Sequence, residues 1–272
     1  MSNITKIAIP ILYLISILSI VITSNLTGYE TLLQDMTIEN GFFETISVVI
    51  LLIIFFYGFY CALKNKKKFN RVTLFFIISF SLLAFVAGME EISWGQQIFH
   101  FQSSEYFLEQ NLQKETNLHN LIDGNIFSSI IYSTIYILFI YLPLFYKLLP
   151  YLKHFKVLKY FDINPHTILI TLFASVFQLY FYNDIGVIVD MITHLVALLL
   201  FGYFIWSRER NIWLEIHFGF IVVATLLSMW CYKIYDFFNM QYEIRESIVV
   251  LSAFLIFMEL IQKEKTRKET LV

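Results

Sequence analysis

The sequence predicts an all-α protein, a polytopic helical bundle embedded in a membrane. Of its 272 residues, 58% are hydrophobic and 15% are charged, whereas a soluble domain carries about 25% charged residues. The apolar residues come in blocks of roughly 20, the length that crosses a hydrocarbon core of about 30 Å. Lys and Arg gather in alternate connections between these blocks, as they do in membrane proteins of fixed orientation.

Eight apolar blocks are candidate membrane spans, and we expect seven or eight of them to cross. The first starts beside Lys6 and has no small-residue cleavage pattern before Asn25, so we interpret it as a retained helix rather than a signal peptide. The fifth is short and contains Gln178 and Asn183. In chain order the expected spans are 5–24, 41–63, 72–89, 126–148, 167–183, 187–206, 212–232 and 247–262.

The basic residues predict that both termini face the cytoplasm. Sixteen of the nineteen Lys and Arg residues lie on the side of the termini, and only Lys114, Lys233 and Arg245 lie on the other side. The positive-inside rule assigns the richer side to the cytoplasm, and an even number of spans requires the same arrangement. We therefore expect a multi-pass protein of the inner (plasma) membrane.

The remaining composition excludes several classes. Cys61 and Cys231 lie singly in apolar runs, which argues against a disulfide framework or a Cys-based zinc motif. A net charge of −2 gives no basic face for nucleic acid, so membrane lipids are the expected partners. With no long linker or repeat, residues 1–272 are predicted to form one integral membrane domain, and high Ile, Phe, Lys and Asn usage suggests a bacterial source.

The stretch from Gly88 to Gln97, at the end of the third span, is strongly polar. It holds the adjacent carboxylates Glu90 and Glu91, a Ser, a Trp and two Gln. Ionised groups at this depth cost several kcal/mol, so they usually face a protein interior or a wet cavity. We therefore expect 90–123 to be an outward-facing functional segment.

About 30 residues separate the third and fourth spans, far more than neighbouring helices need. The part from Asn111 to Asn120 is dense in amides and includes His119. Long connections of this kind are often functional, and irregular backbone at membrane depth must pack on protein or line a cavity. We expect a re-entrant or membrane-surface segment here.

Ionisable side chains from separate elements are expected in one outer layer. Glu44 lies about one turn inside the outer end of the second span, near the depth of the Glu90–Glu91 pair. Asp190 and His194 share one face of the sixth span at i,i+4 spacing. Trp94 and Gln97 would continue the helical face of Glu90 at i+4 and i+7.

Each of these residues also has a structural interpretation. Asp190 and His194 would serve equally as a buried hydrogen-bonded pair, and Glu44 near a helix start would favour the positive end of the dipole. The Glu90–Glu91 pair would sit as readily among lipid headgroups, and His119 would be an ordinary loop residue. Their coincidence in depth favours a common site. Four histidines have no polar neighbour in the sequence and are left unassigned: His100, His154, His166 and His217.

The predicted cluster suits the activation of water. A buried Glu can act as a general base while a His positions or protonates the leaving group, and the same groups could instead hold a divalent metal such as zinc. The catalytic candidates are Glu90, Glu91, His119, Asp190 and His194. If a metal is bound, its expected ligands are Glu91, His119, Asp190 and His194. The substrate-binding candidates are Glu44, Ser93, Trp94, Gln97, Asn111, Gln113, Glu115 and Asn117.

Three stretches are similar to a group of uncharacterised bacterial multi-pass membrane proteins. That group carries the motifs E-x-G-x-x-E, G-E-E-I-S-W-G-Q and N-x-Q-x-E-x-N-L-H-N. Here they match 39–44, 89–96 and 111–120, with Met89 in place of the first Gly of the second motif. The resemblance implies a common site over 39–120, and it brings no known activity.

Two shorter resemblances concern hydrolases. Glu90-Glu91 resembles the start of the E-E-x-x-x-R motif of CAAX-type glutamate intramembrane proteases, although Gly95 stands where that family has Arg. Residues 38–47 are similar to the E-F-W-N-T-I-S stretch of alkaline ceramidase-like hydrolases, which bind zinc. Asp190-x-x-x-His194 stands in place of their H-x-x-x-H pair, so neither mechanism carries over.

The sequence thus favours a membrane-embedded hydrolase or transferase that acts on a lipid or lipid-linked substrate at the outer leaflet. Two alternatives stay open. A transporter or proton-coupled carrier would also need polar residues in the inner half of the bundle. A non-catalytic sensor or assembly subunit would use the outer segment to bind a ligand or partner.

Overall fold

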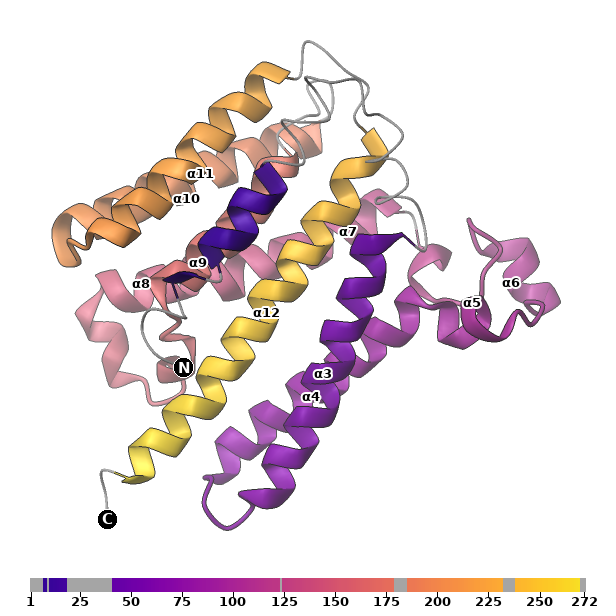
Figure 1. Ribbon diagram of the computed structural model, residues 1–272, viewed down its shortest axis with the longest axis horizontal. Coiled ribbons are helices and arrows are strands. Elements are labelled where there is room, and N and C mark those ends of the chain that lie inside the picture. The colour runs from indigo at the N-terminus through magenta and orange to yellow at the C-terminus, as the bar shows by residue number, and fades with distance from the viewer. Residues whose placement is uncertain are drawn as a thin grey trace. The chain divides into compact units, whose positions relative to one another are not determined.

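The computed structural model describes residues 7–8, 10–18, 41–122, 124–178, 185–231 and 238–269, and within these ranges the fold is all-α with no strand (Figure 1). The chain divides into two compact units. Unit 1 comprises Met1–Ile38 and Ser133–Ser252, and unit 2 comprises Glu39–Tyr132 and Ala253–Val272.

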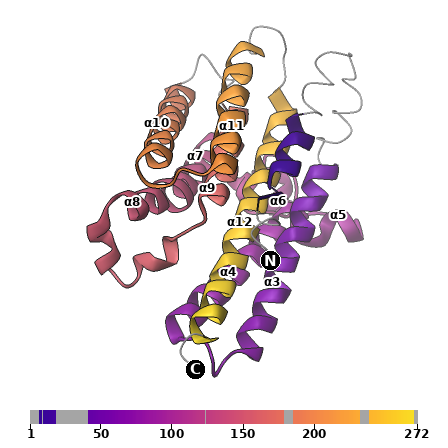
Figure 2. The same ribbon diagram turned by 60° about the vertical axis from the view of Figure 1, so that its left-hand side comes forward.

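Unit 2 is built on a hairpin of two long apolar helices, α3 (Phe42–Lys64) and α4 (Arg71–Glu91), which lie side by side in both views (Figures 1 and 2). Asn70 caps α4, since its side chain accepts a hydrogen bond from the Thr73 N–H at 2.8 Å. The same side chain donates to Glu264 at 3.0 Å. Glu264 lies in the last part of α12 (Phe238–Glu269), so this contact ties the C-terminal helix to the turn of the hairpin.

A small residue lets α3 and α4 approach closely. A Cβ on Gly88 would lie 3.3 Å from the Leu51 Cβ and 3.9 Å from the Val48 carbonyl oxygen. Small residues allow such close helix contacts in membrane proteins. Because Gly88 packs against this first part of α3, Glu44 and Glu91 lie at the same end of the hairpin, as the sequence predicts.

Short helices follow α4 and form the segment that carries the candidate site. Figure 1 shows α5 and α6 beyond the C-terminal end of α4. In chain order the elements are η1 (Ser93–Gly95), α5 (Gln96–Phe99), α6 (Glu105–Gln110), η2 (His119–Leu121) and α7 (Gly124–Ile135).

Unit 1 contains the remaining helices, together with a helical stretch at 10–18 and the first half of α12. Pro143 explains the π-helical turn before it: proline has no N–H and clashes with the carbonyl four residues earlier, which widens the helix. The elements are η3 (Tyr136–Tyr141), α8 (Leu142–Leu148), η4 (Pro150–His154), η5 (Leu158–Phe161), α9 (Pro165–Ala174), η6 (Ser175–Gln178), α10 (Ile185–Arg208) and α11 (Ile212–Cys231).

Among the described residues, five helical runs are long and apolar enough to cross a membrane, which marks the protein as membrane-embedded. They coincide with five of the predicted spans. Their bounds are Phe42–Lys64, Arg71–Glu91, Ser129–Leu148, Met191–Arg208 and Ile212–Met229.

The other three predicted spans differ from these five. The expected span 5–24 is described as helix only at 7–8 and 10–18, and the rest of it lies outside the described residues. The expected span 167–183 is a shorter apolar helix, Pro165–Phe177, and its last residues are not described. The expected span 247–262 lies within α12, which is not among the candidate spans and carries charges on both sides of its apolar part. The count of seven or eight spans therefore stays a prediction.

Candidate functional site

Helix α4 ends at Glu91, and the chain then turns through three residues in the left-handed region. Ser93, Trp94 and Gly95 have φ values of 46°, 55° and 91°. Only Gly adopts this region without a penalty, and other residues pay roughly 1–2 kcal/mol. The expectation that Trp94 and Gln97 continue the helical face of Glu90 is therefore wrong, because the regular helix stops before them.

The carboxylate of Glu90 is the central acceptor of the segment. Its Oε2 accepts the backbone N–H groups of Leu118 at 2.6 Å and His119 at 3.0 Å. Its Oε1 accepts the indole N–H of Trp94 at 2.5 Å. Hydrogen bonds to an ionised group are roughly twice as strong as neutral ones, so Glu90 fastens the returning chain to the end of α4.

The imidazole of His119 lies against the same carboxylate. Its Nδ1 is 3.4 Å from Glu90 Oε2, at the long end of a hydrogen bond. The two side chains are 29% and 12% exposed, and the His119 ring packs on Phe127 with centroids 6.0 Å apart. No described residue bonds the other ring nitrogen, Nε2. This is the carboxylate–imidazole arrangement in which one nitrogen is oriented and the other is available for a proton.

A second polar group joins the side chains of Ser93, Glu115 and Asn117. The hydroxyl of Ser93 donates to the carboxylate of Glu115. The Asn117 side-chain amide donates to Ser93 Oγ at 3.1 Å and to Glu115 Oε2 at 3.2 Å. Ser93 and Asn117 are 0% and 1% exposed. These side chains satisfy one another, as buried polar groups must.

The amides of the returning loop continue this network. Asn111 donates to Asn117 Oδ1 at 2.8 Å and accepts the backbone N–H groups of Gln113 and Glu115 at 2.9 and 3.2 Å. The side chain of Asn120 donates to Gln113. The sequence predicts Asn111, Gln113, Glu115 and Asn117 as substrate-binding candidates, and the structure shows most of their polar atoms used to fold the loop itself.

The network also contains four residues that were not among the predicted site residues: Gln96, Ser103, Thr116 and Asn120. Gln96 Oε1 accepts the Thr116 N–H at 2.7 Å and the Ser103 hydroxyl at 3.0 Å. Gln96 belongs to the polar stretch 88–97, so the sequence marks it as a candidate for the site. Ser103 lies in a stretch without any pattern, and nothing in the sequence marks it.

The other candidates of unit 2 lie on α3, at the end of α4 and in the turn and short helix that follow it. Glu91 is half-buried at the last position of α4, beside Glu90. Glu44 is buried in the first turn of α3, at 7% exposure, and Ser47 is buried on the same side of that helix. Gln97 is half-buried on α5, while Trp94 is 40% exposed.

His194 belongs to unit 1 and has different partners. It is fully buried, with Nδ1 at the Ser175 hydroxyl and Nε2 2.9 Å from Thr225 Oγ1. Asp190 lies one turn earlier on α10, and its side chain is outside the described part of the structure. That His194 and Asp190 share one site with Glu90 stays a prediction.

Unit 1 also holds a buried histidine pair that the sequence left unassigned. Nδ1 of His166, on α9, is 3.3 Å from Nδ1 of His217, on α11, and the rings stack at an interplanar angle of 17°. Both are buried, and Nε2 of His217 has no hydrogen-bond partner among the residues that the structure describes. The sequence gives one indication of this polar layer: Thr167, Thr171 and Ser175 recur every four residues along α9 and into η6.

No group of three or more His, Cys, Asp or Glu side chains that could hold a metal ion occurs in the described part of the chain. Both ring nitrogens of His194 are engaged by hydroxyl groups, and Nδ1 of His119 is engaged by Glu90. The described side chains therefore form no such group from the expected metal ligands, and metal binding stays a prediction.

Comparison of the chain with protein-family models, with curated proteins and with solved structures finds no match.

Proposed function

We propose that the protein is a membrane-embedded hydrolase or transferase that acts on a lipid or lipid-linked substrate, with His119 as its general base. The observation that supports this is the Glu90–His119 contact at the end of α4. Two backbone N–H groups and the Trp94 indole fix the carboxylate, which in turn orients the imidazole.

The proposed chemistry uses the unbonded nitrogen of His119. Nε2 takes a proton from a water or an acceptor hydroxyl, whose oxygen then attacks the acyl or phosphoryl centre of the lipid. The protonated ring returns this proton to the leaving oxygen, so the enzyme ends unchanged. Glu90 acts as the orienting carboxylate, and Glu91 stays a candidate for contact with the substrate.

The position of the pair fits a lipid substrate. It follows a helix long and apolar enough to cross a membrane, and Trp94, which contacts Glu90, is partly exposed. Tryptophan is typical of the membrane–water interface. The distribution of Lys and Arg favours the outer leaflet of the inner membrane for this end of α4, with both termini in the cytoplasm.

The test uses purified protein in vesicles of a bacterial polar lipid extract, with lipid products measured by mass spectrometry. His119→Gln should lower product formation by about 10²-fold or more, because general-base catalysis contributes that much. His154→Gln is the matched control. His154 is an exposed histidine that contacts the nearby Tyr151 carbonyl, and it is 35 residues away from His119 in sequence.

His119→Gly separates chemistry from folding. It keeps the backbone N–H that bonds Glu90, so added imidazole should restore part of the activity if the ring acts as a base. Turnover that is unchanged in His119→Gln would overturn the proposal. So would the absence of any lipid product from the wild-type protein.

A second candidate, a proton-coupled carrier, is favoured by the buried histidines of unit 1. A carrier needs polar groups in the inner half of the bundle, and in the proposed orientation His166 and His217 lie near the cytoplasmic ends of α9 and α11. Thr225, which contacts His194, is eight residues further along α11, about 12 Å. Histidines and hydroxyls can pass protons between them.

Vesicles that enclose a pH-sensitive dye distinguish the two candidates. A carrier predicts a proton flux that follows an imposed potential and falls in His217→Gln. If no flux occurs above that of empty vesicles, the carrier is excluded, and the lipid-product assay decides the enzyme separately.

A further inference from the structure

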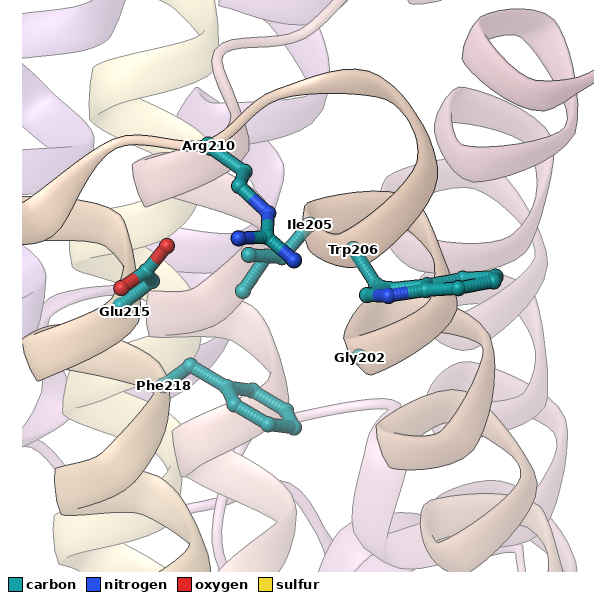
Figure 3. Close-up of a pocket in the computed structure, with 6 residues that line it drawn as sticks. All are labelled: Gly202, Ile205, Trp206, Arg210, Glu215 and Phe218. Carbon is teal, nitrogen blue, oxygen red and sulfur yellow. The ribbon is translucent and has the colours of Figure 1, made fainter.

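A pocket of about 320 Å³ lies between the end of α10 and the start of α11 (Figure 3). Its volume falls at the lower end of the roughly 300–1,000 Å³ range of small-molecule sites. Helix α10 contributes one face of residues at i, i+3 and i+4 spacing, and α11 contributes two at i, i+3. The six lining residues are Gly202, Ile205, Trp206, Arg210, Glu215 and Phe218.

The pocket holds two opposite charges that do not neutralise each other. Figure 3 shows the Arg210 guanidinium extending over the pocket and the Glu215 carboxylate on the wall beside it. Neither side chain forms an ion pair or hydrogen bond with any described residue. Arg208, two residues earlier, points instead to the Leu148 carbonyl oxygen at 3.5 Å. Arg210 is therefore the cation that the pocket offers to a ligand.

The pocket is charged at the end near the helix connection and apolar further along the helices, as a phospholipid is charged at its headgroup and apolar along its acyl chains. Residues 209–211 join two runs that are each long and apolar enough to cross a membrane, so this connection lies at a bilayer surface. Arg210 belongs to the connection and Glu215 to the first turn of α11. Gly202 and Phe218 lie further from the connection, about 9 Å along each helix, at the depth of acyl chains.

Glycine at position 202 keeps the apolar floor open. A Cβ there would lie 3.3 Å from the tip of the Phe218 ring, closer than ordinary contact. The Trp206 ring, 68% exposed, forms the wall across from Glu215 (Figure 3). This wall and floor offer contact to hydrocarbon, while the two charges stand at the surface end.

We propose that this pocket binds the headgroup of a zwitterionic phospholipid with a primary ammonium, a phosphatidylethanolamine. Arg210 donates to its phosphate and Glu215 accepts from its ammonium group, which has three N–H donors. A trimethylated ammonium has no N–H for Glu215, and a glycerol headgroup has no positive charge. This binding site is separate from the Glu90–His119 pair and does not depend on the proposed reaction.

Native mass spectrometry of the delipidated protein tests this binding, with ethanolamine, choline and glycerol phospholipids of equal chain length. Ethanolamine lipid should bind about tenfold more tightly than the other two. Arg210→Gln and Glu215→Gln should each lower its affinity by about tenfold, the effect of one charged hydrogen bond. Glu209→Gln, an exposed carboxylate in the same connection that does not line the pocket, should bind as wild type does.

Free phosphoethanolamine, added at the same concentrations, tests whether the pocket binds a lipid or the soluble headgroup compound. Binding of the lipid but not of the soluble compound supports the proposal. Equal retention of all three lipids would overturn it, as would wild-type affinity in both pocket variants or a preference for the soluble compound. Both side chains are exposed, so unchanged melting of the lipid-free variants excludes misfolding as the cause of a loss.

Discussion

At the scale of single residues, Glu90 joins parts of the chain that are far apart in sequence. Its Oε2 holds the N–H groups of Leu118 and His119, which lie 28 and 29 residues further along. The side chain of Asn117 and the hydroxyl of Ser93 form a second tie across 24 residues. The candidate base is therefore positioned by contacts from the end of α4.

Glu90→Gln should loosen the loop that carries His119. An amide has one acceptor oxygen where the carboxylate has two, so it cannot hold the Trp94 indole and both N–H groups at once. Each charged hydrogen bond is worth about 1.5–3 kcal/mol, so the Leu118 and His119 amides should exchange with deuterium at least about tenfold faster. Hydrogen-exchange mass spectrometry of peptides over 111–122 measures this change.

Glu109→Gln serves as the control for that experiment. Glu109 is an exposed carboxylate on α6, within the same segment, and it takes no part in the described network. Wild-type exchange at Leu118 and His119 in Glu90→Gln would show that the carboxylate does not hold the loop.

At the scale of elements, the end of α4 depends on a glycine. Gly95 has a φ of 91°, and a Cβ there would lie 3.2 Å from the Phe99 ring. The two residues before it are already in the left-handed region, so the turn has little freedom to relax. This turn redirects the chain into α5 and brings Gln96 to Thr116 and Ser103.

Gly95→Ala should destabilise the segment by about 1–2 kcal/mol, the cost of the left-handed conformation for a residue with a Cβ. Faster proteolysis within 93–121 and a lower melting temperature report the effect. Gly219→Ala is a matched control on α11: a Cβ there meets nothing within 4 Å, so the change should be neutral or should stabilise the helix by up to about 1 kcal/mol. If both variants behaved alike, the turn would not require glycine.

At the scale of the whole molecule, α4 is long and apolar enough to cross a membrane, and its two ends differ in charge. Its 21 residues extend about 30 Å, the thickness of a hydrocarbon core. Four lysines cluster at one end of the helix, before Arg71, and the acidic segment follows at the other. This asymmetry predicts a lysine-rich turn in the cytoplasm and an outward-facing segment at 90–123.

Single cysteines at Lys67 and Glu109 test this topology, in a protein whose native cysteines are replaced by alanine. Both positions are exposed. A membrane-impermeant maleimide should label Glu109→Cys in intact cells and Lys67→Cys only after permeabilisation. Labelling of both from the same side would contradict a crossing by α4, and the reverse pattern would invert the orientation.

Much of the candidate site follows from the sequence, because its chemistry is concentrated in two stretches. The polar run after Ala87 and the amide-rich stretch 111–120 mark the residues that the structure joins. Their roles were less predictable. The sequence predicts Asn111 and Asn117 as substrate-binding amides. In the structure the Asn111 amide donates to the Asn117 side-chain oxygen, a contact that depends on the path of the loop.

The sequence by itself determines the fold class, five helices of the described residues that are long and apolar enough to cross a membrane, and the position of the polar segment. These depend on local composition, since about 20 consecutive apolar residues must form a helix when no water is present to bond the backbone. The tertiary structure decides which polar groups meet. Loop closure and helix packing bring together residues that are distant in sequence, and hydrophobic periodicity does not predict such partners. Examples are the Glu90–His119 contact, the His166–His217 pair and the pocket with Arg210 and Glu215.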